Sequence, residues 1–308
     1  MNQSKFSLAD LLTLMGAITF GFFFFLGYNF LTLGDFTKSI IMASAFAFGL
    51  GMIAYVLKTL KRASRNFKTT ILTELILFIT YVIVAYFSIS PLVHYFAVSQ
   101  QKEEIQNKLI SNITEAEGLF EAYDGYADNR ISLYERKLRS IVQAKIVNPS
   151  QYEDFGFIPG TSDETQLKAK VDALEYKLKP SNYEEMKENL TWLSESKSKV
   201  ENWSPIEVVE IVNKLNSEVK SWNSKLNENS IYRQEGEETA DFDSPISFDE
   251  VSTIFKTKNS ANPMGIGIGL GLCFLMLFSY LISKRHDRIR GNVLKLLFGD
   301  STTDDKEL

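Results

Sequence analysis

The stretch LLTLMGAITFGFFFFLGYNFLTL, residues 11–33, contains no charged side chain and decides the class of protein. Three further stretches share this property, namely residues 40–57, 75–93 and 263–283. An uncharged, mostly apolar run of about 18 residues or more is long enough to cross a hydrocarbon core roughly 30 Å thick as a helix. The sequence therefore excludes a wholly soluble protein, although its 45% apolar and 23% charged residues are averages typical of soluble chains.

We expect four transmembrane helices, at residues 11–33, 40–57, 71–98 and 263–283. The first run is too long for the core of a signal peptide, and no small-residue cleavage site follows it, so it is predicted to be an uncleaved anchor. Residues 99–262 separate the third span from the fourth and are numerous enough for one domain. The predicted fold is all-α, a four-span helix bundle with a helical domain inserted between spans three and four.

Basic residues in the short flanks predict the orientation. The loop at residues 58–69 contains five of them and no acid: Lys58, Lys61, Arg62, Arg65 and Lys68. The tail at residues 284–308 begins with a second basic cluster. With four spans both flanks lie on one side, which the positive-inside rule identifies as the cytoplasm. Both termini are then cytoplasmic and residues 99–262 extracytoplasmic. The composition, rich in Lys, Asn, Ile and Glu, favours a bacterial inner membrane.

The charge is divided unevenly between the two parts of the chain. Residues 99–262 contain 20 Lys and Arg against 30 Asp and Glu, and 20 − 30 = −10. The remainder contains 13 basic and 8 acidic residues, a balance of +5, and the two parts sum to the net charge of −5. We therefore expect no nucleic-acid partner for the acidic domain. The basic flanks are read as topology determinants, with an anionic-lipid site as the alternative.

The pattern of residues 99–262 is helical. Apolar residues recur every three or four positions from Ile105 to Tyr123, and again from Ile131 to Ile141. One long helix continuing span three is possible, but glycine costs a helix interior about 1 kcal/mol, and we favour a break at residues 124–129. Heptads are not sustained, so the domain is coiled-coil-like without being an extended coiled coil. The acidic stretch 227–243 is predicted to be a linker.

Ionisable residues inside predicted spans are candidate functional residues. Glu74 lies about one turn into span three, where it is either an interfacial carboxylate or a proton or cation site between helices. His94, near the other end of this span, is either an interfacial histidine or a proton relay or metal ligand. Only one other histidine exists, which excludes a histidine-rich metal site. Pro91 predicts a kink, acting either as a gating hinge or simply in helix packing.

Rows of small residues predict close helix packing, because they let helix backbones approach in lipid. The rows lie in spans two and four and consist of Ala43, Ala47, Gly51, Gly265, Gly267, Gly269 and Gly271. They predict packing of spans two and four within one bundle, or contact between copies in a homo-oligomer. Trp192, Trp203 and Trp222 are either core anchors of the helical domain or a partner-binding patch.

No catalytic or metal-binding motif is present, so we expect no enzyme activity, cofactor or metal. The leading hypothesis is a membrane scaffold or complex subunit that presents an acidic helical extracytoplasmic domain to an unidentified protein partner. The alternative is an oligomeric channel or transporter-like pore with Glu74 in the conduit. The lipid bilayer is an expected partner in both cases.

Overall fold

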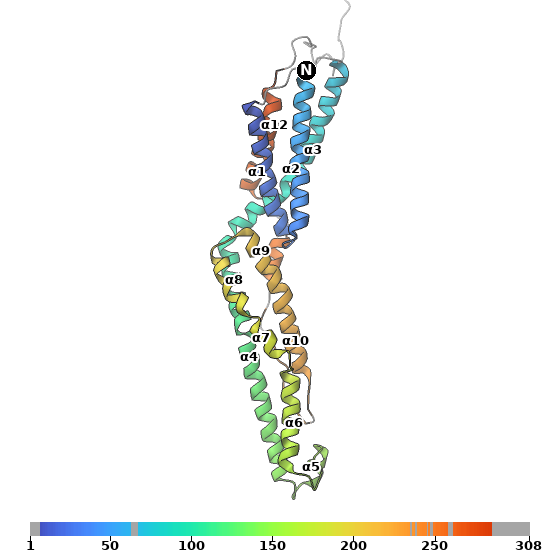
Figure 1. Cartoon of the computed structure of the whole chain (residues 1–308), viewed down its shortest axis with the longest axis vertical. Coiled ribbons are helices and arrows are strands. Elements are labelled where there is room, and N and C mark those ends of the chain that lie inside the picture. Colours follow the sequence, from blue (N-terminus) through green and yellow to red (C-terminus); the bar gives the residue numbers. More distant parts are fainter. Residues whose placement is uncertain are drawn as a thin grey trace, which may run out of the picture. The chain divides into compact units, whose positions relative to one another are not determined.

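The computed structural model describes residues 7–62, 67–234, 236–237, 239–244, 246, 249–257 and 261–284, and these contain helices and no strand (Figure 1). The predicted all-α class is therefore confirmed. The helices are α1 (Leu8–Leu31), α2 (Phe36–Arg62), α3 (Phe67–Gln100), α4 (Lys102–Gln143), α5 (Pro149–Asp154), α6 (Asp163–Leu178), α7 (Tyr183–Glu188), α8 (Thr191–Glu201), α9 (Pro205–Lys214), the π-helical turn η1 (Leu215–Val219), α10 (Lys220–Ile231), α11 (Asp249–Lys256) and α12 (Pro263–Ile282).

Four helices are long and apolar enough to cross a membrane: α1, α2, α3 and α12. These are the four predicted spans, and their length and composition are compatible with a multi-pass membrane protein. The helices differ from the predicted spans mainly at the basic loop. Because α2 continues to Arg62 and α3 begins at Phe67, most of the predicted loop 58–69 is helical. Residues 63–66 of that loop, and all of the predicted tail except Lys284, lie outside the described residues.

The chain divides into two compact units. The first comprises residues 1–101 and 254–308, and the second residues 102–253. The second unit follows α3 and precedes α12 in the chain, close to the predicted domain at 99–262.

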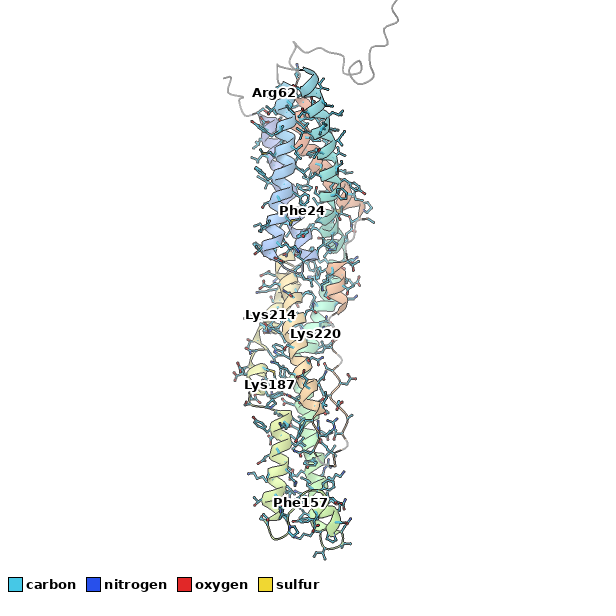
Figure 2. The ribbon with its side chains drawn as sticks, turned by 90° about the vertical axis from the view of Figure 1, so that its right-hand side faces the viewer. Phe24, Arg62, Phe157, Lys187, Lys214 and Lys220 are labelled. Carbon is cyan, nitrogen blue, oxygen red and sulfur yellow. The ribbon has the colours of Figure 1, made fainter. Side chains whose placement is uncertain are left out.

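The first unit is a four-helix bundle in which each of the four long helices packs on the other three. Large side chains fill its centre, and Figure 2 shows Phe24 among them. The fully buried members of this core include Phe20, Phe24, Leu50, Leu57, Leu92 and Met276. Tyr81 of α3 donates a hydrogen bond over 2.7 Å to the carbonyl oxygen of Cys273 on α12, so its hydroxyl is satisfied inside the core.

A tight turn joins α1 to α2. The Gly34 N–H donates to the Asn29 carbonyl oxygen over 3.0 Å, and Gly34 has a φ of +88°. This left-handed conformation ends many helices and favours glycine, which has no Cβ to clash. The turn allows α2 to begin at Phe36 and to run antiparallel beside α1.

The second unit is built along α4. The broken helix α6–α8 returns antiparallel to α4, since Arg139 pairs with Glu164 at one end and Gln106 reaches the Val200 carbonyl oxygen at the other. The nearly continuous helix α9–η1–α10 completes the unit and contacts α4, α6 and α8 (Figure 1).

The predicted break at residues 124–129 is wrong, because α4 is one continuous helix. The two apolar patterns are a single buried face that continues through Tyr123, Ala127 and Arg130. A Cβ atom on Gly118 or Gly125 would meet nothing within 4 Å, so both glycines lie on the open side of the helix. Burial of the opposite face outweighs their helix cost of about 1 kcal/mol each. The interruption of the helical chain lies instead at Gln101, between α3 and α4.

The segment that the sequence predicts to be an acidic linker also differs. Its first residues complete α10, and its described remainder packs on α4. Phe242 lies edge-on to Tyr123 with ring centroids 5.1 Å apart, and Tyr126 donates to the Ala240 carbonyl oxygen over 2.8 Å. The composition of this segment alone is typical of a mobile chain, but aromatic contacts of this kind fix it against α4.

Candidate functional site

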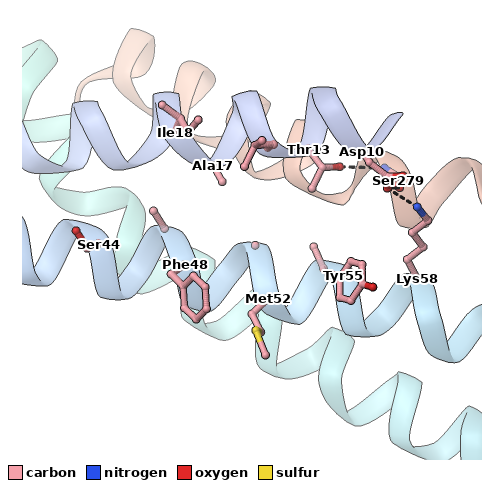
Figure 3. A pocket seen from close by; sticks show the side chains of 14 residues that line it. Asp10, Thr13, Ala17, Ile18, Ser44, Phe48, Met52, Tyr55, Lys58 and Ser279 are labelled. Carbon is pink, nitrogen blue, oxygen red and sulfur yellow. Dashed lines mark hydrogen bonds and ion pairs between the residues drawn. The ribbon is translucent and has the colours of Figure 1, made fainter. Parts of the chain in front are cut away.

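Three helices of the bundle meet at the Asp10 carboxylate. Lys58 of α2 forms an ion pair with Asp10 of α1, and Ser279 of α12 donates to the same carboxylate oxygen over 2.6 Å (Figure 3). The Lys58 residue is only 6% exposed. A buried charge needs a partner of opposite charge and further hydrogen bonds, and this arrangement supplies both.

The local sequence explains why Asp10 takes this place. Ser7 caps the start of α1, and its N–H and hydroxyl donate to the second carboxylate oxygen of Asp10 over 3.0 and 2.8 Å. This reciprocal arrangement is a capping box. One oxygen of Asp10 therefore stabilises its own helix terminus, while the other joins α1 to α2 and α12.

A second polar group lies between α2, α3 and α12. Tyr280 donates to the Glu74 carboxylate over 2.7 Å, and Glu74 is 4% exposed. Lys61 donates to the carbonyl oxygens of Tyr280 and Leu281 over 2.9 and 3.2 Å, and its ammonium lies 4.6 Å from the Tyr280 ring centroid. A cation is favourable at the C-terminus of a helix, where carbonyl groups lack intrahelical partners.

The structure thus places Glu74 within the protein and against Tyr280, not on an exposed surface. Between the two sequence readings, its burial fits a site between helices better than an interfacial carboxylate. A role in proton or cation transfer stays a prediction.

His94 is also buried, with 1% of its surface exposed. Its Nε2 lies 2.9 Å from the carbonyl oxygen of Phe255, and because a carbonyl only accepts, that nitrogen carries the proton. The ring lies edge-on to Phe30, with centroids 6.4 Å apart. The arrangement anchors the start of the chain segment that leads into α12. The relay and metal-ligand readings stay predictions.

Pro91 lies inside α3, as predicted. Its carbonyl group packs directly on Gly27 of α1, where a side chain would overlap it. Of the two serines nearby, Ser88 donates to the Ala85 carbonyl oxygen over 3.0 Å, and the buried Ser90 hydroxyl has no partner among the described atoms. Pro91 is therefore part of a close helix contact, and the hinge role stays a prediction.

The small residues of α2 and α12 pack within the bundle, on α1 and α3. On α12, Gly265 lies against Val93 and Gly269 against Ile89, where a Cβ would come within 2.8 and 2.9 Å of them. Gly267 and Gly271 alternate with them and meet nothing within 4 Å. On α2, Ala43 is buried, Ala47 lies next to Gly21, and a Cβ on Gly51 would lie 3.7 Å from the Ala17 Cβ. Only alternate glycines of the α12 row thus make close contacts.

A groove of about 600 Å³ runs between α1 and α2 and ends at the Asp10–Lys58 pair (Figure 3). Its wall from α2 extends from Ser44 to Lys58. Small side chains line its floor, and the larger Phe48, Met52 and Tyr55 stand at its exposed side. Apart from Ser44, the groove is apolar along most of its length, and its other polar side chains gather at the end with Asp10 and Lys58.

Sequence reasoning missed Asp10 and took Lys58 only as a topology determinant. Both residues lie just outside the uncharged stretches that define the spans. A signal was present, because the acid and the base lie at the same predicted membrane face, at the ends of adjacent spans. Opposite charges at such positions can pair when the two helices are antiparallel neighbours.

The second unit carries an apolar surface at the end where α4, α5 and α6 meet, which we call the apolar tip (Ile146, Val147 and Ile158). These side chains are 88%, 89% and 64% exposed. Their loops are held in place, because Lys145 pairs with Asp163, and Gln166 bonds the Ile158 N–H and carbonyl oxygen over 2.8 and 3.1 Å. Figure 2 labels Phe157 in this region, which stacks on Tyr152 beneath the surface.

One tryptophan belongs to the interior of the second unit, and the other two are half-buried. Trp222 is 6% exposed and packs on Phe120 and Trp192, with ring centroids 5.8 and 6.3 Å apart. The Lys214 ammonium lies 4.3 Å from the Trp192 ring centroid and covers it. Trp203 is half-buried. For Trp222 and Trp192, these contacts favour the core interpretation over a partner-binding patch.

Within the described residues, no group of three His, Cys, Asp or Glu side chains is placed to hold a metal ion. No protein-family model, curated protein or solved structure shows significant similarity to the chain. The chemistry of its own surfaces therefore carries the functional argument.

Proposed function

We propose that the chain is a non-enzymatic membrane subunit or scaffold whose acidic helical domain contacts a protein partner through the apolar tip. The observation that carries this proposal is the exposure of Ile146 and Val147, at 88% and 89%, on a turn that the Lys145–Asp163 ion pair joins to α6. Contiguous exposed apolar side chains, rimmed by charged ones, mark protein interaction sites.

The fixed geometry of the tip supports a recognition role. Tyr152 donates to Asp163 over 2.6 Å, and Asp163 also pairs with Lys145, so the ends of α4, α5 and α6 are joined. A surface that is already ordered loses less conformational freedom on binding. The chemistry of the tip calls for a partner with an apolar pocket, large enough for two or three aliphatic side chains.

The location that goes with this proposal is a bacterial inner membrane, with residues 99–262 outside and both termini in the cytoplasm. The support is the basic character of the flanks that follow α2 and α12. A tip on the extracytoplasmic side would meet membrane-anchored or exported partners. A homo-oligomer is compatible with the same role.

A pore with Glu74 in its conduit is the less favoured function. Glu74 bonds Tyr280, and bulky side chains such as Phe24 and Leu50 occupy the centre of the bundle. A conduit would therefore have to form between copies of the chain. Flux through liposomes that falls in Glu74→Gln would favour this function over the scaffold.

The test of the proposed function uses a photoreactive amino acid at position 147 in the full chain, activated in native membranes. We expect a discrete adduct with one protein, reduced at least tenfold by Ile146→Asn. Ile231 provides a matched control, because it is also apolar and is 61% exposed elsewhere in the unit. A probe at position 231 should give no such adduct. Equal adducts from both positions, or none from position 147, would contradict the proposal.

A further inference from the structure

The groove between α1 and α2 has the dimensions of a single hydrocarbon chain. Its α2 wall from Ser44 to Lys58 spans 14 residue steps, about 21 Å at the helix rise of 1.5 Å per residue. One leaflet of a hydrocarbon core is about 15 Å deep, half of the total thickness. A chain of about 16 methylene groups, each close to the roughly 30 Å³ of a water molecule, occupies about 500 Å³. The groove volume of about 600 Å³ matches this.

The cross-section of the groove also favours a narrow occupant. Its floor consists of small residues. Ala17 and Gly51 face one another there, and a Cβ on Gly51 would lie 3.7 Å from the Ala17 Cβ. Phe48 and Tyr55 stand at the exposed side and are 72% and 60% exposed. A helix about 10 Å across would rest on these large side chains without filling the floor. A flexible chain can enter between them.

Basic residues outnumber acidic ones around the polar end of the groove, with Lys58, Lys61 and Arg62 against Asp10 and Glu74. Asp10 and Lys58 compensate one another, and Lys61 offsets Glu74, since both contact Tyr280. Arg62 lies four residues after Lys58, hence on the same face of α2, and is exposed. Basic groups at a membrane surface attract anionic headgroups by about 1 kcal/mol each.

We propose that this groove binds one acyl chain of an anionic phospholipid, with its phosphate beside Arg62 and the Asp10–Lys58 pair. Lys61, bonded to the Tyr280 carbonyl oxygen, adds to the positive field at the same end. The Thr13 hydroxyl lines the groove next to the ion pair and extends the polar surface there. The bound lipid covers the α1–α2 face and differs from surrounding lipid in being retained and selected by headgroup.

The experiment measures the lipid that stays on the full chain after purification in mild detergent, by native mass spectrometry. Dioleoyl phosphatidylglycerol and dioleoyl phosphatidylcholine are supplied in equal amounts, so that only the headgroup differs. We expect one phosphatidylglycerol per chain, in at least fivefold preference over phosphatidylcholine.

Two pairs of variants separate the groove from the headgroup site. Gly51→Phe fills the groove and should reduce retention at least tenfold, whereas Gly49→Phe, on a side of α2 where a Cβ meets nothing within 4 Å, should not. Arg62→Gln should lower the headgroup preference about fivefold, the equivalent of ~1 kcal/mol. Lys38→Gln, an exposed change at the other end of α2, should leave it unaltered.

The outcomes that overturn the proposal are specific. They are retention in Gly51→Phe equal to the unchanged chain, an absence of bound lipid, or equal binding of the two headgroups. A groove covered by a second copy would appear as a dimer that Gly51→Phe, but not Gly49→Phe, converts to monomer without changing the lipid count. The measurement is independent of the partner crosslink, so failure of one proposal leaves the other standing.

Discussion

Gly27 of α1 packs directly against the carbonyl group of Pro91 on α3, with no space for a side chain between them. The neighbouring atoms belong to backbone, which cannot rotate away as a side chain can. The close contact of α1 with α3 therefore depends on glycine at this position.

Gly27→Ala should destabilise the bundle by about 3 kcal/mol or more, because overpacking in a close-packed interior forces the backbones apart. The measurement is the loss of monodisperse protein during heating in detergent, followed by size-exclusion chromatography. Gly267→Ala is the matched control, since a Cβ there meets nothing within 4 Å. Equal behaviour of the two variants would show that the contact is not required.

The Asp10–Lys58 pair should behave as a unit. Removal of one buried partner costs about 3–5 kcal/mol, because the other charge is left unpaired, whereas removal of both costs less. We expect Lys58→Met to be more destabilising alone than together with Asp10→Asn, in thermal unfolding of the full chain. Strictly additive effects in this double-mutant cycle would mean that the two groups do not interact.

Arg130 should be the most sensitive charged residue of the second unit. It is 0% exposed, pairs with Glu237, and donates to the carbonyl oxygen of Ser230 at the end of α10 over 2.6 Å. Arg130→Met should cost about 3–5 kcal/mol and expose residues 232–244 to proteases, because an uncompensated carboxylate is left inside. Arg136→Met, an exposed change six residues further along α4, should change proteolysis little.

Asp124 should contribute to stability in a pH-dependent way. Burial opposes its ionisation, but hydrogen bonds from Lys187, Lys179 and Tyr183 outweigh burial and lower the pKa of Asp124 from 3.8 to about 2. Because the folded pKa is the lower one, this stabilisation is complete above about pH 4 and is lost as the pH falls towards 2. Solvent screening at this partly exposed carboxylate keeps the stabilisation below the roughly 2 kcal/mol that the shift alone would correspond to.

The check is the free energy of unfolding, measured between pH 6 and pH 2, for the unchanged chain and for Asp124→Asn. The difference between them should shrink across the interval from pH 4 to pH 2. Asp128→Asn removes a neighbouring carboxylate that also contacts Lys179 but has a side chain 68% exposed, and it should have a smaller effect. A constant difference across that interval would refute the assignment.

The proposed orientation predicts which cysteines an impermeant maleimide reaches in intact cells. Ser150→Cys, on α5 of the helical domain, should be labelled, while Ser301→Cys in the tail should require permeabilised cells. The background should be low, since Cys273 is the only cysteine of the chain and is 6% exposed. Labelling of Ser301→Cys but not of Ser150→Cys in intact cells would show that the orientation is the opposite of the proposed one.

The spans were predictable because the absence of charge over about 20 residues is a strong, local signal. The helix on which the small residues pack was not predictable. Gly265 and Gly269 allow close approach of any neighbouring helix, and only the folded bundle shows that this neighbour is α3. The continuity of α4 was missed because the helix cost of Gly118 and Gly125 was weighed without the burial of the opposite face, which includes the charged Arg130. Its partners lie about a hundred residues further along the chain, beyond the reach of periodicity.

The position of Cys273 has a consequence for redox behaviour. The only thiol of the chain, that of Cys273, is buried in the bundle core. The backbone carbonyl group of the same residue accepts the hydrogen bond from Tyr81. Oxidants and exchanging disulfides react with accessible thiolates. The folded chain is therefore expected to behave identically in oxidising and reducing surroundings, and to need no oxidative folding step on either side of a membrane.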